Sequence, residues 1–212
     1  MSDQALLSRL QQGIEALGQE ASAELCERYL VYLELLVRWN KAYNLSGIKD
    51  PEQMIARHIL DSLSVRPYIS GETCLDVGTG AGLPGLILSL SLPETHWLLL
   101  DSNRKKIRFL NQAILALKLT NVEARQGRVE ELPGERPFSV IISRALGPLA
   151  RFWEITEKLR DQNTRLLAMK GALPGEELAE LSKNIEITIH KLSVPGLDEE
   201  RHLIVMQSTK EP

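Results

Sequence analysis

The sequence has few cysteines, few aromatic residues and no long apolar run. Its 212 residues include two cysteines, Cys26 and Cys74, and no CxxC motif, which excludes a disulfide framework and a structural zinc site. Aromatic residues make up 5%, which argues against binding single-stranded bases mainly by stacking. The most apolar stretch, residues 82–93, is broken by Gly, Ser and Pro, and the first twenty residues do not resemble a signal peptide. We therefore expect a cytoplasmic protein without a membrane span.

What is present is an ordinary globular composition with an uneven charge distribution. Hydrophobic residues make up 43% and charged residues 25%, while the net charge is −3. Residues 101–128 nevertheless contain seven basic residues and two acidic ones, and residues 174–212 contain eight acidic and four basic. The basic segment predicts either an anionic partner or a solvated helix surface. Arg104, Lys105 and Lys106 begin a predicted helix, where the helix dipole is unfavourable for cations, and this favours the anionic partner.

The periodicity of apolar residues divides the chain into two parts. Residues 1–70 predict an N-terminal helical extension, with helices over 3–17, 22–39 and from 51 onward. Residues 71–212 predict one compact α/β domain in which strands alternate with helices, and the last two strands, joined by a turn, form a hairpin with one antiparallel strand. This ending is typical of a class I methyltransferase with a seven-stranded Rossmann-like sheet. The predicted strands are 73–77, 96–101, 122–126, 139–143, 165–169, 185–192 and 203–208, and the helices between them are 83–92, 104–117, 149–159 and 175–182.

A glycine-rich loop over residues 76–85 carries the clearest binding motif. Residues 80–85 match G-x-G-x-x-G, which is typical of dinucleotide sites, but Pro84 removes an N–H that a pyrophosphate would use. Residues 76–82 match D-x-G-x-G-x-G, the form found in S-adenosylmethionine sites, and the carboxylate of Asp76 suits the cationic amino-acid part of that ligand. Asp101 ends the next strand, where a carboxylate can bind the ribose hydroxyls of either ligand.

Eight segments of the chain carry a family resemblance. The sequence closely resembles the bacterial small-subunit ribosomal RNA methyltransferase G family, formerly glucose-inhibited division protein B. The resemblance implies a class I fold with an N-terminal helical extension, which uses S-adenosylmethionine to methylate N7 of guanine 527 in 16S rRNA. Ser46 and Ala81 replace a frequent Thr and a frequent Pro of the family. The matching segments are WNKAYNLSGIKD (39–50), RHILDSL (57–63), LDVGTGAGLPG (75–85), LLDSNRKKIRFL (99–110), RVEE (128–131), ISRAL (142–146), KG (170–171) and ERHLIV (200–205).

The resemblance also implies positions for the binding residues. Asp101 is added to the cofactor site from the fold alone, and His202 alternates with Arg201 on a strand, so at most one of these two should face the site. The expected cofactor contacts are Gly78, Leu83, Val129, Glu130, Arg144 and Asp101. The candidate RNA contacts are Arg57, His58, Arg104, Lys105, Lys106, Arg128, Arg144, Lys170 and Arg201.

The acceptor atom that the resemblance implies constrains the chemistry. Guanine N7 has a free lone pair and loses no proton on methylation, so we expect no general base and assign no catalytic residue or metal. The expected partner is 16S rRNA, in the small ribosomal subunit or an assembly intermediate, bound by a monomer. Two alternatives stay open: a methyltransferase acting on another RNA or a small molecule, and a nucleotide-binding module without catalysis.

Overall fold

The sheet of the domain has seven strands in the order β3-β2-β1-β4-β5-β7-β6. A computed structural model describes residues 3–134, 137–144, 146–182 and 184–209. Strands β1 to β5 are parallel, whereas β7 runs antiparallel to both of its neighbours, β5 and β6. The predicted hairpin and its antiparallel strand are therefore confirmed. The strands are β1 (Thr73–Val77), β2 (His96–Asp101), β3 (Val122–Gln126), β4 (Val140–Arg144), β5 (Arg165–Lys170), β6 (Ile185–Leu192) and β7 (Arg201–Ser208).

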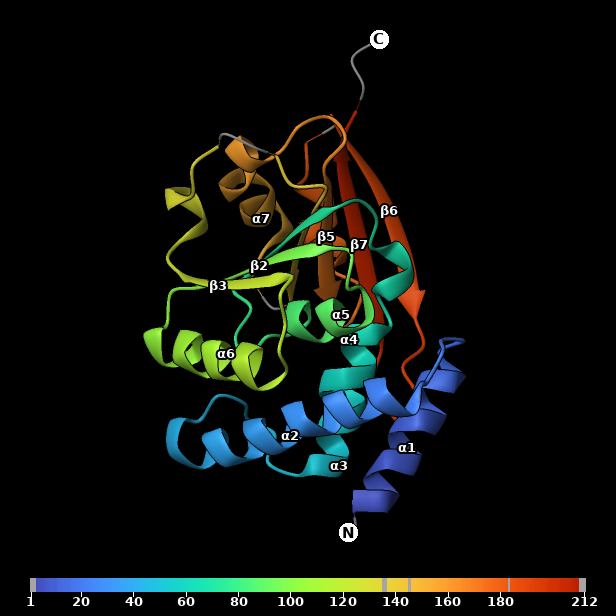
Figure 1. Ribbon diagram of the computed structural model, residues 1–212. Coiled ribbons are helices and arrows are strands. Elements are labelled where there is room, and N and C mark those ends of the chain that lie inside the picture. The colour runs from blue at the N-terminus through green and yellow to red at the C-terminus, as the bar shows by residue number, and fades with distance from the viewer. Residues whose placement is uncertain (1–2, 135–136, 145, 183, 210–212) are drawn as a thin grey trace.

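Helices cover both faces of this sheet. Figure 1 shows α5 and α6 on the same side as the N-terminal helices, with α7 on the opposite side. The inner strands β1, β4 and β5 are thus buried on both faces, as in parallel sheets generally, whereas the edge strands β3 and β6 are partly exposed. The helical elements are α1 (Asp3–Ala16), α2 (Ala23–Tyr43), α3 (Pro51–Met54), the π-helical η1 (Ile55–Leu60), α4 (Asp61–Leu63), η2 (Arg66–Tyr68), α5 (Gly85–Ser91), α6 (Arg104–Ala116), η3 (Val129–Glu131), α7 (Leu149–Ile155), η4 (Glu157–Leu159) and α8 (Gly175–Ala179).

The N-terminal helices share their core with one face of the sheet. Tyr29 and Tyr32 of α2 are fully buried in the same cluster as side chains of α5 and α6. The hydroxyl of Tyr32 donates to the carbonyl of Ala81 at 2.8 Å, and its ring meets Phe109 edge-on with centroids 6.1 Å apart. The extension therefore packs directly beneath the glycine-rich loop and fixes its position.

Two helical segments depart from the regular α-helices that their periodicity predicts. The stretch after Pro51 begins as expected, with Asp50 capping the N–H of Glu52, but η1 is π-helical over six residues. Such π turns are rare and occur often at functional sites. The helix predicted over residues 149–159 is interrupted at Thr156, whose hydroxyl donates to the carbonyl of Phe152 at 2.8 Å. Both departures come from local bonding that apolar spacing does not reveal.

Candidate active site

The glycine-rich loop connects β1 to α5 in a conformation that requires glycine. Gly78, Gly80 and Gly82 have φ angles of +70°, +63° and +89°. Side chains other than glycine rarely adopt this left-handed region, since the Cβ atom crowds the backbone. At Gly78 an added Cβ would lie 3.3 Å from Cδ1 of Leu146. Gly78 is exposed, so its backbone is open to a ligand, whereas Gly82 is buried.

Asp76 stabilises this loop from inside. Its Oδ2 accepts hydrogen bonds from the hydroxyl of Thr79 at 2.7 Å and from the N–H of Gly85 at 2.8 Å. The side chain is fully buried, and burial raises the pKa of Asp76 to about 6. The expectation that this carboxylate contacts a cationic ligand is therefore wrong, because Asp76 is turned into the protein to hold the loop.

A first pocket, of about 410 Å³, lies beside the loop at the carboxyl ends of β1 and β2. Open α/β folds bind ligands at this edge of the sheet. Gly78 and Asp101 line it on one side and the short helix η3 on the other. The first pocket is formed by Val77, Gly78, Leu100, Asp101, Ser102, Lys106, Gly127, Arg128, Val129, Glu130, Leu146, Arg151 and Ile155.

Asp101 is the only carboxylate at the end of β2, and it is 5% exposed. Its Oδ2 accepts from the N–H of Gly80 at 2.9 Å and from Nζ of Lys106 at 3.2 Å, while its Oδ1 accepts from the N–H of Asn103 at 2.8 Å. One carboxylate thus ties the glycine-rich loop to the start of α6. Lys106 is turned toward the first pocket, whereas Arg104 and Lys105 are exposed.

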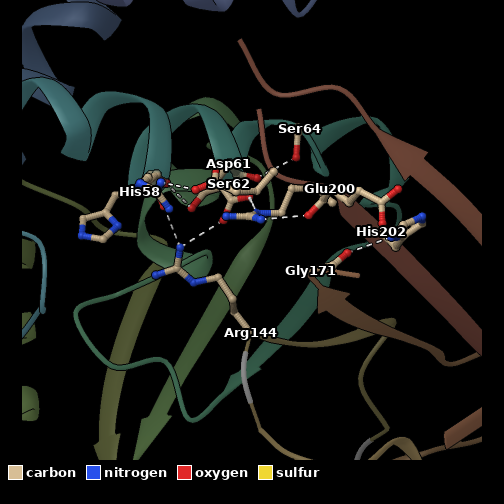
Figure 2. A network of polar contacts seen from close by, with 11 residues as sticks. His58, Asp61, Ser62, Ser64, Arg144, Gly171, Glu200 and His202 are labelled. Carbon is tan, nitrogen blue, oxygen red and sulfur yellow. Dashed lines mark hydrogen bonds and ion pairs between the residues drawn. The ribbon is translucent and has the colours of Figure 1, made fainter. Parts of the chain in front are cut away.

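A second pocket, of about 500 Å³, lies over the ends of β4 and β5 and the start of β7. Residues of η1 and α4 in the N-terminal extension border it, and Figure 2 shows two of them, His58 and Asp61, facing Arg144. Four arginine or lysine side chains line it together with one buried carboxylate. The second pocket is formed by Ile48, Arg57, His58, Asp61, Arg144, Met169, Lys170, Gly171, Leu192, Arg201 and His202.

His58 is buried at the wall of the second pocket, with 5% of its surface exposed. Its Nε2 lies 2.8 Å from the hydroxyl of Ser46, and its Nδ1 has no hydrogen-bond partner among the described residues. Burial and the nearby guanidinium of Arg144 lower the pKa of His58 to about 4. The imidazole is therefore neutral at physiological pH, with one unsatisfied nitrogen beside the pocket.

Comparison with known proteins identifies the family of this chain. The family model for rRNA small subunit methyltransferase G matches residues 25–204. The chain is 47% identical over 202 residues to ribosomal RNA small subunit methyltransferase G of Pseudomonas aeruginosa, covering 94% of each chain. It is 43% identical to the protein of that name from Escherichia coli, covering 97% of this chain and 100% of the other. The chain belongs to this family.

Solved structures agree on the fold. A Bacillus subtilis tRNA methyltransferase aligns with a TM-score of 0.59 and 14% identity, covering 72% of this chain and 67% of the other. A SAM-dependent methyltransferase from Aquifex aeolicus aligns with a TM-score of 0.56 and 18% identity, covering 77% and 97%. The protein is thus a class I methyltransferase of the rRNA methyltransferase G family that uses S-adenosylmethionine, and the dinucleotide interpretation of residues 80–85 is wrong.

The residues expected to bind the cofactor of this methyltransferase fall into two groups. Gly78, Asp101, Val129 and Glu130 line the first pocket. Leu83 is buried in the core beneath the loop, and Arg144 lines the second pocket instead. The contact that the resemblance implies for these two residues stays a prediction.

The candidate RNA contacts are also divided between the pockets. Arg57, His58, Arg144, Lys170 and Arg201 line the second pocket, Lys106 and Arg128 line the first, and Arg104 and Lys105 line neither. Several of these cations are paired within the protein: Arg57 with Glu199, and Lys170 with Glu177 at 2.8 Å. Ala145, inside the ISRAL segment, lies outside the described residues.

The expectation that at most one of Arg201 and His202 faces the site is wrong. Both line the second pocket. Arg201 is the first residue of β7, and its long side chain reaches Oδ1 of Asp61 at 3.1 Å, while Nδ1 of His202 lies 2.8 Å from the carbonyl of Gly171. Strict alternation fails here because a long side chain at a strand end is free to bend along the sheet edge.

Sequence reasoning missed the carboxylate at the centre of the second pocket. Asp61 is 3% exposed and accepts from Arg144 and Arg201. A signal was available, since Asp61 lies three residues after His58 within the RHILDSL segment, and residues three apart share a helix face. Glu177, the partner of Lys170, lies outside every matching segment and gave no such signal.

None of the helices that the structure describes combines the length and the apolar composition that crossing a membrane requires. The described residues contain no group of three or more His, Cys, Asp or Glu side chains placed to bind a metal ion.

Proposed function

We propose that this methyltransferase transfers the methyl group of S-adenosylmethionine to N7 of guanine 527 in 16S rRNA. The observation that carries the proposal is the arrangement of two pockets along one edge of the sheet. The first lies over β1 and β2, the second over β4 and β5, and β1 and β4 are adjacent strands. A donor and an acceptor base bound in neighbouring pockets can meet where the two pockets approach each other.

The first pocket suits S-adenosylmethionine. Asp101 presents a carboxylate of the kind that binds ribose hydroxyls, and the bare backbone at Gly78 permits close approach of a ligand. Val129, one of the cofactor contacts that the resemblance implies, is an apolar part of the same wall. When bound, the cofactor supplies an electrophilic methyl group on a sulfonium. Asp101, Gly78, Val129 and Glu130 would hold it there.

The second pocket suits the acceptor guanine. Arg144 and Arg201 offer N–H donors, which guanine O6 accepts, and His58 is neutral, so it adds no positive charge to the pocket. Because N7 loses no proton on methylation, these side chains need only orient the base and exclude water. The methyl transfer that we propose therefore depends on positioning and uses no general base.

The proposed substrate also indicates the partner and the compartment. We infer that the protein acts as a monomer on 16S rRNA in the small subunit or its assembly intermediate, because one chain supplies both pockets. We place it in the cytoplasm, in keeping with its two free, buried cysteines. The division into a helical extension (1–70) and a catalytic domain (71–212) stays a prediction, and the shared core argues that the two parts fold together.

Transfer of labelled methyl groups tests this function directly. The purified protein is incubated with labelled S-adenosylmethionine and with 16S rRNA, 30S subunits, 23S rRNA or tRNA isolated from cells that lack the enzyme. We expect label only in 16S rRNA or 30S subunits, and the preferred form identifies the substrate. Label confined to tRNA or 23S rRNA would favour a methyltransferase for another RNA, and cofactor binding without any transfer would favour a non-catalytic module.

Substitution of Gly78 tests the first pocket. In Gly78→Ala the new methyl group lies 3.3 Å from Leu146 and at a φ of +70°. We expect the affinity for S-adenosylmethionine to fall at least tenfold, about 1.4 kcal/mol, while the fold persists. Titration calorimetry measures the affinity. Gly175→Ala, where nothing lies within 4 Å of the added Cβ, serves as control. Unchanged affinity in Gly78→Ala would remove the loop from the site.

Neutralising the exposed cations of α6 tests the RNA surface. The double variant Arg104→Gln/Lys105→Gln should bind 16S rRNA more weakly and with a flatter salt dependence, because fewer counterions are released. Lys106→Gln is the contrast on the same helix: Lys106 contacts Asp101, so its loss should change cofactor affinity more than the salt slope. A salt slope in the double variant equal to that of the parent would mean that these two residues are only solvated.

The pH dependence of the rate tests the absence of a general base. The pKa of His58 is lowered to about 4, so its imidazole does not titrate between about pH 6 and 8. The single-turnover rate on saturating substrates should therefore be flat over that range, in the parent and in His58→Ala alike. A parental rate that rises tenfold per pH unit, and becomes flat in His58→Ala, would make His58 a base and exclude N7 as the acceptor.

A further inference from the structure

Asp61 joins three segments that lie far apart in the sequence. It begins α4, directly after η1, and its carboxylate reaches the second pocket. Its Oδ2 accepts from Nη1 of Arg144 at the end of β4, and its Oδ1 accepts from Nε of Arg201 at the start of β7, both at 3.1 Å. Figure 2 shows Arg144 extending from the sheet toward the helical segment that carries Asp61.

The guanidinium groups of Arg144 and Arg201 use some of their N–H donors within the described part of the protein and leave the others unused there. Nη1 of Arg144 also donates to the carbonyl of Arg57, and Nη1 of Arg201 donates to that of Glu200. Each guanidinium therefore uses two of its five N–H donors on the described residues. The side chains of Arg144 and Arg201 keep 26% and 21% exposure, and both line the second pocket. Donors thus remain for a ligand there.

Burying the carboxylate of Asp61 between two arginines would contribute little to the stability of the fold if these side chains served packing alone. Asp61 is 3% exposed, and a buried carboxylate flanked by two arginines is often no more stable than apolar side chains of similar volume. What the carboxylate supplies is orientation, because an acceptor between two guanidiniums limits the rotation of both. It also offsets one of their two positive charges beside a base that becomes cationic on N7 methylation.

We propose that Asp61 is a positioning residue for the methyl transfer. It holds Arg144 and Arg201 with their free N–H groups toward the acceptor guanine and limits the positive charge next to the purine. The inference rests on the proposed function, since it requires that the second pocket takes the guanine. Asp61 acts through the two arginines and contacts neither the methyl donor nor the acceptor atom.

The isosteric variant Asp61→Asn provides the first test. An amide offers one acceptor where two guanidiniums need one each, so at least one arginine is released. At saturating substrates the single-turnover rate should fall about 100-fold, as expected for misplaced reacting groups. The affinity for S-adenosylmethionine should change less than threefold, and that for 16S rRNA should be equal or greater. Glu123→Gln, which makes the same charge change in the exposed pair with Arg125, should keep the parental rate.

A charge-retaining variant separates positioning from a merely structural role. Asp61→Glu restores the carboxylate, so it should recover at least tenfold of the rate lost in Asp61→Asn. The rates of both variants are normalised to the concentration of protein that binds the cofactor. A smaller folded fraction then does not lower the measured rate. A rate in Asp61→Asn within threefold of the parent, or a loss that appears only in cofactor affinity, would overturn the proposal.

A mutant cycle distinguishes this proposal from the proposed function. In the Arg144→Ala/Arg201→Ala background, Asp61→Asn should cost less than threefold, because the groups that it positions are gone. This background lacks the two arginines that Asp61→Asn leaves without a carboxylate partner. The effect of Asp61→Asn can therefore be measured there even if the single variant does not fold. A full additional loss there would contradict positioning through the arginines. If removing both arginines leaves the rate unchanged, the second pocket does not take the guanine, and the proposed function fails at that point.

Discussion

Replacing Asp101 with alanine should weaken binding of S-adenosylmethionine about 100-fold, close to 2.7 kcal/mol. The carboxylate accepts from the N–H groups of Gly80 at 2.9 Å and Asn103 at 2.8 Å, so its loss loosens the glycine-rich loop and the start of α6 together. It also removes the acceptor that we assign to the ribose. Titration calorimetry gives the affinity, and circular dichroism shows whether the fold is retained.

The control for this experiment is Asp198→Ala, which removes an exposed carboxylate outside the first pocket. It should bind the cofactor as the parent does. An affinity in Asp101→Ala within threefold of the parent would mean that the first pocket does not hold the ribose. The assignment of the cofactor to this pocket would then be wrong.

Replacing Arg144 with alanine should lower the single-turnover rate about 100-fold, because the acceptor base loses a fixed donor. The side chain lines the second pocket and is bonded to Asp61 and to the carbonyl of Arg57. The affinity for S-adenosylmethionine should therefore change less than threefold, and excess cofactor should not restore the rate. Arg125→Ala, which removes an exposed arginine of β3, is the matched control.

The resemblance also implies a contact of Arg144 with the cofactor, and that contact predicts a different result. If a high concentration of S-adenosylmethionine restored the rate of Arg144→Ala, that implication would be supported. Arg144 would then be assigned to cofactor binding and not to binding of the acceptor guanine. The experiment therefore decides between an assignment made from sequence motifs and one made from the position of the side chain.

The sheet was predictable from sequence because its signals are local. Strands β1, β2, β3 and β6 have the predicted bounds, since apolar runs bounded by turn residues mark a buried strand. The left-handed glycines of the loop were also predictable, because the D-x-G-x-G-x-G pattern places glycine where a positive φ is needed. The terminal hairpin followed from the absence of a helical segment between its strands.

The contacts of the charged side chains were not predictable in the same way. Arg144 and Asp61 are 83 residues apart in the chain, and only the packing of the helical extension on the sheet brings them together. Lys106 belongs to a run of three cations that looks uniformly exposed, yet it turns inward because Asp101 lies within reach at the end of β2. Residue type and spacing identified the cations, but they could not show which of them already have partners.

Mapping the methylated nucleotide tests the central claim most directly. The purified protein is incubated with S-adenosylmethionine and with 30S subunits or 16S rRNA from cells that lack the enzyme, and the rRNA is then digested and analysed by mass spectrometry. Cleavage at 7-methylguanosine by borohydride and aniline locates the position independently. We predict one added methyl group, on N7 of guanine 527. A methyl group on another atom or at another nucleotide would contradict the proposed function.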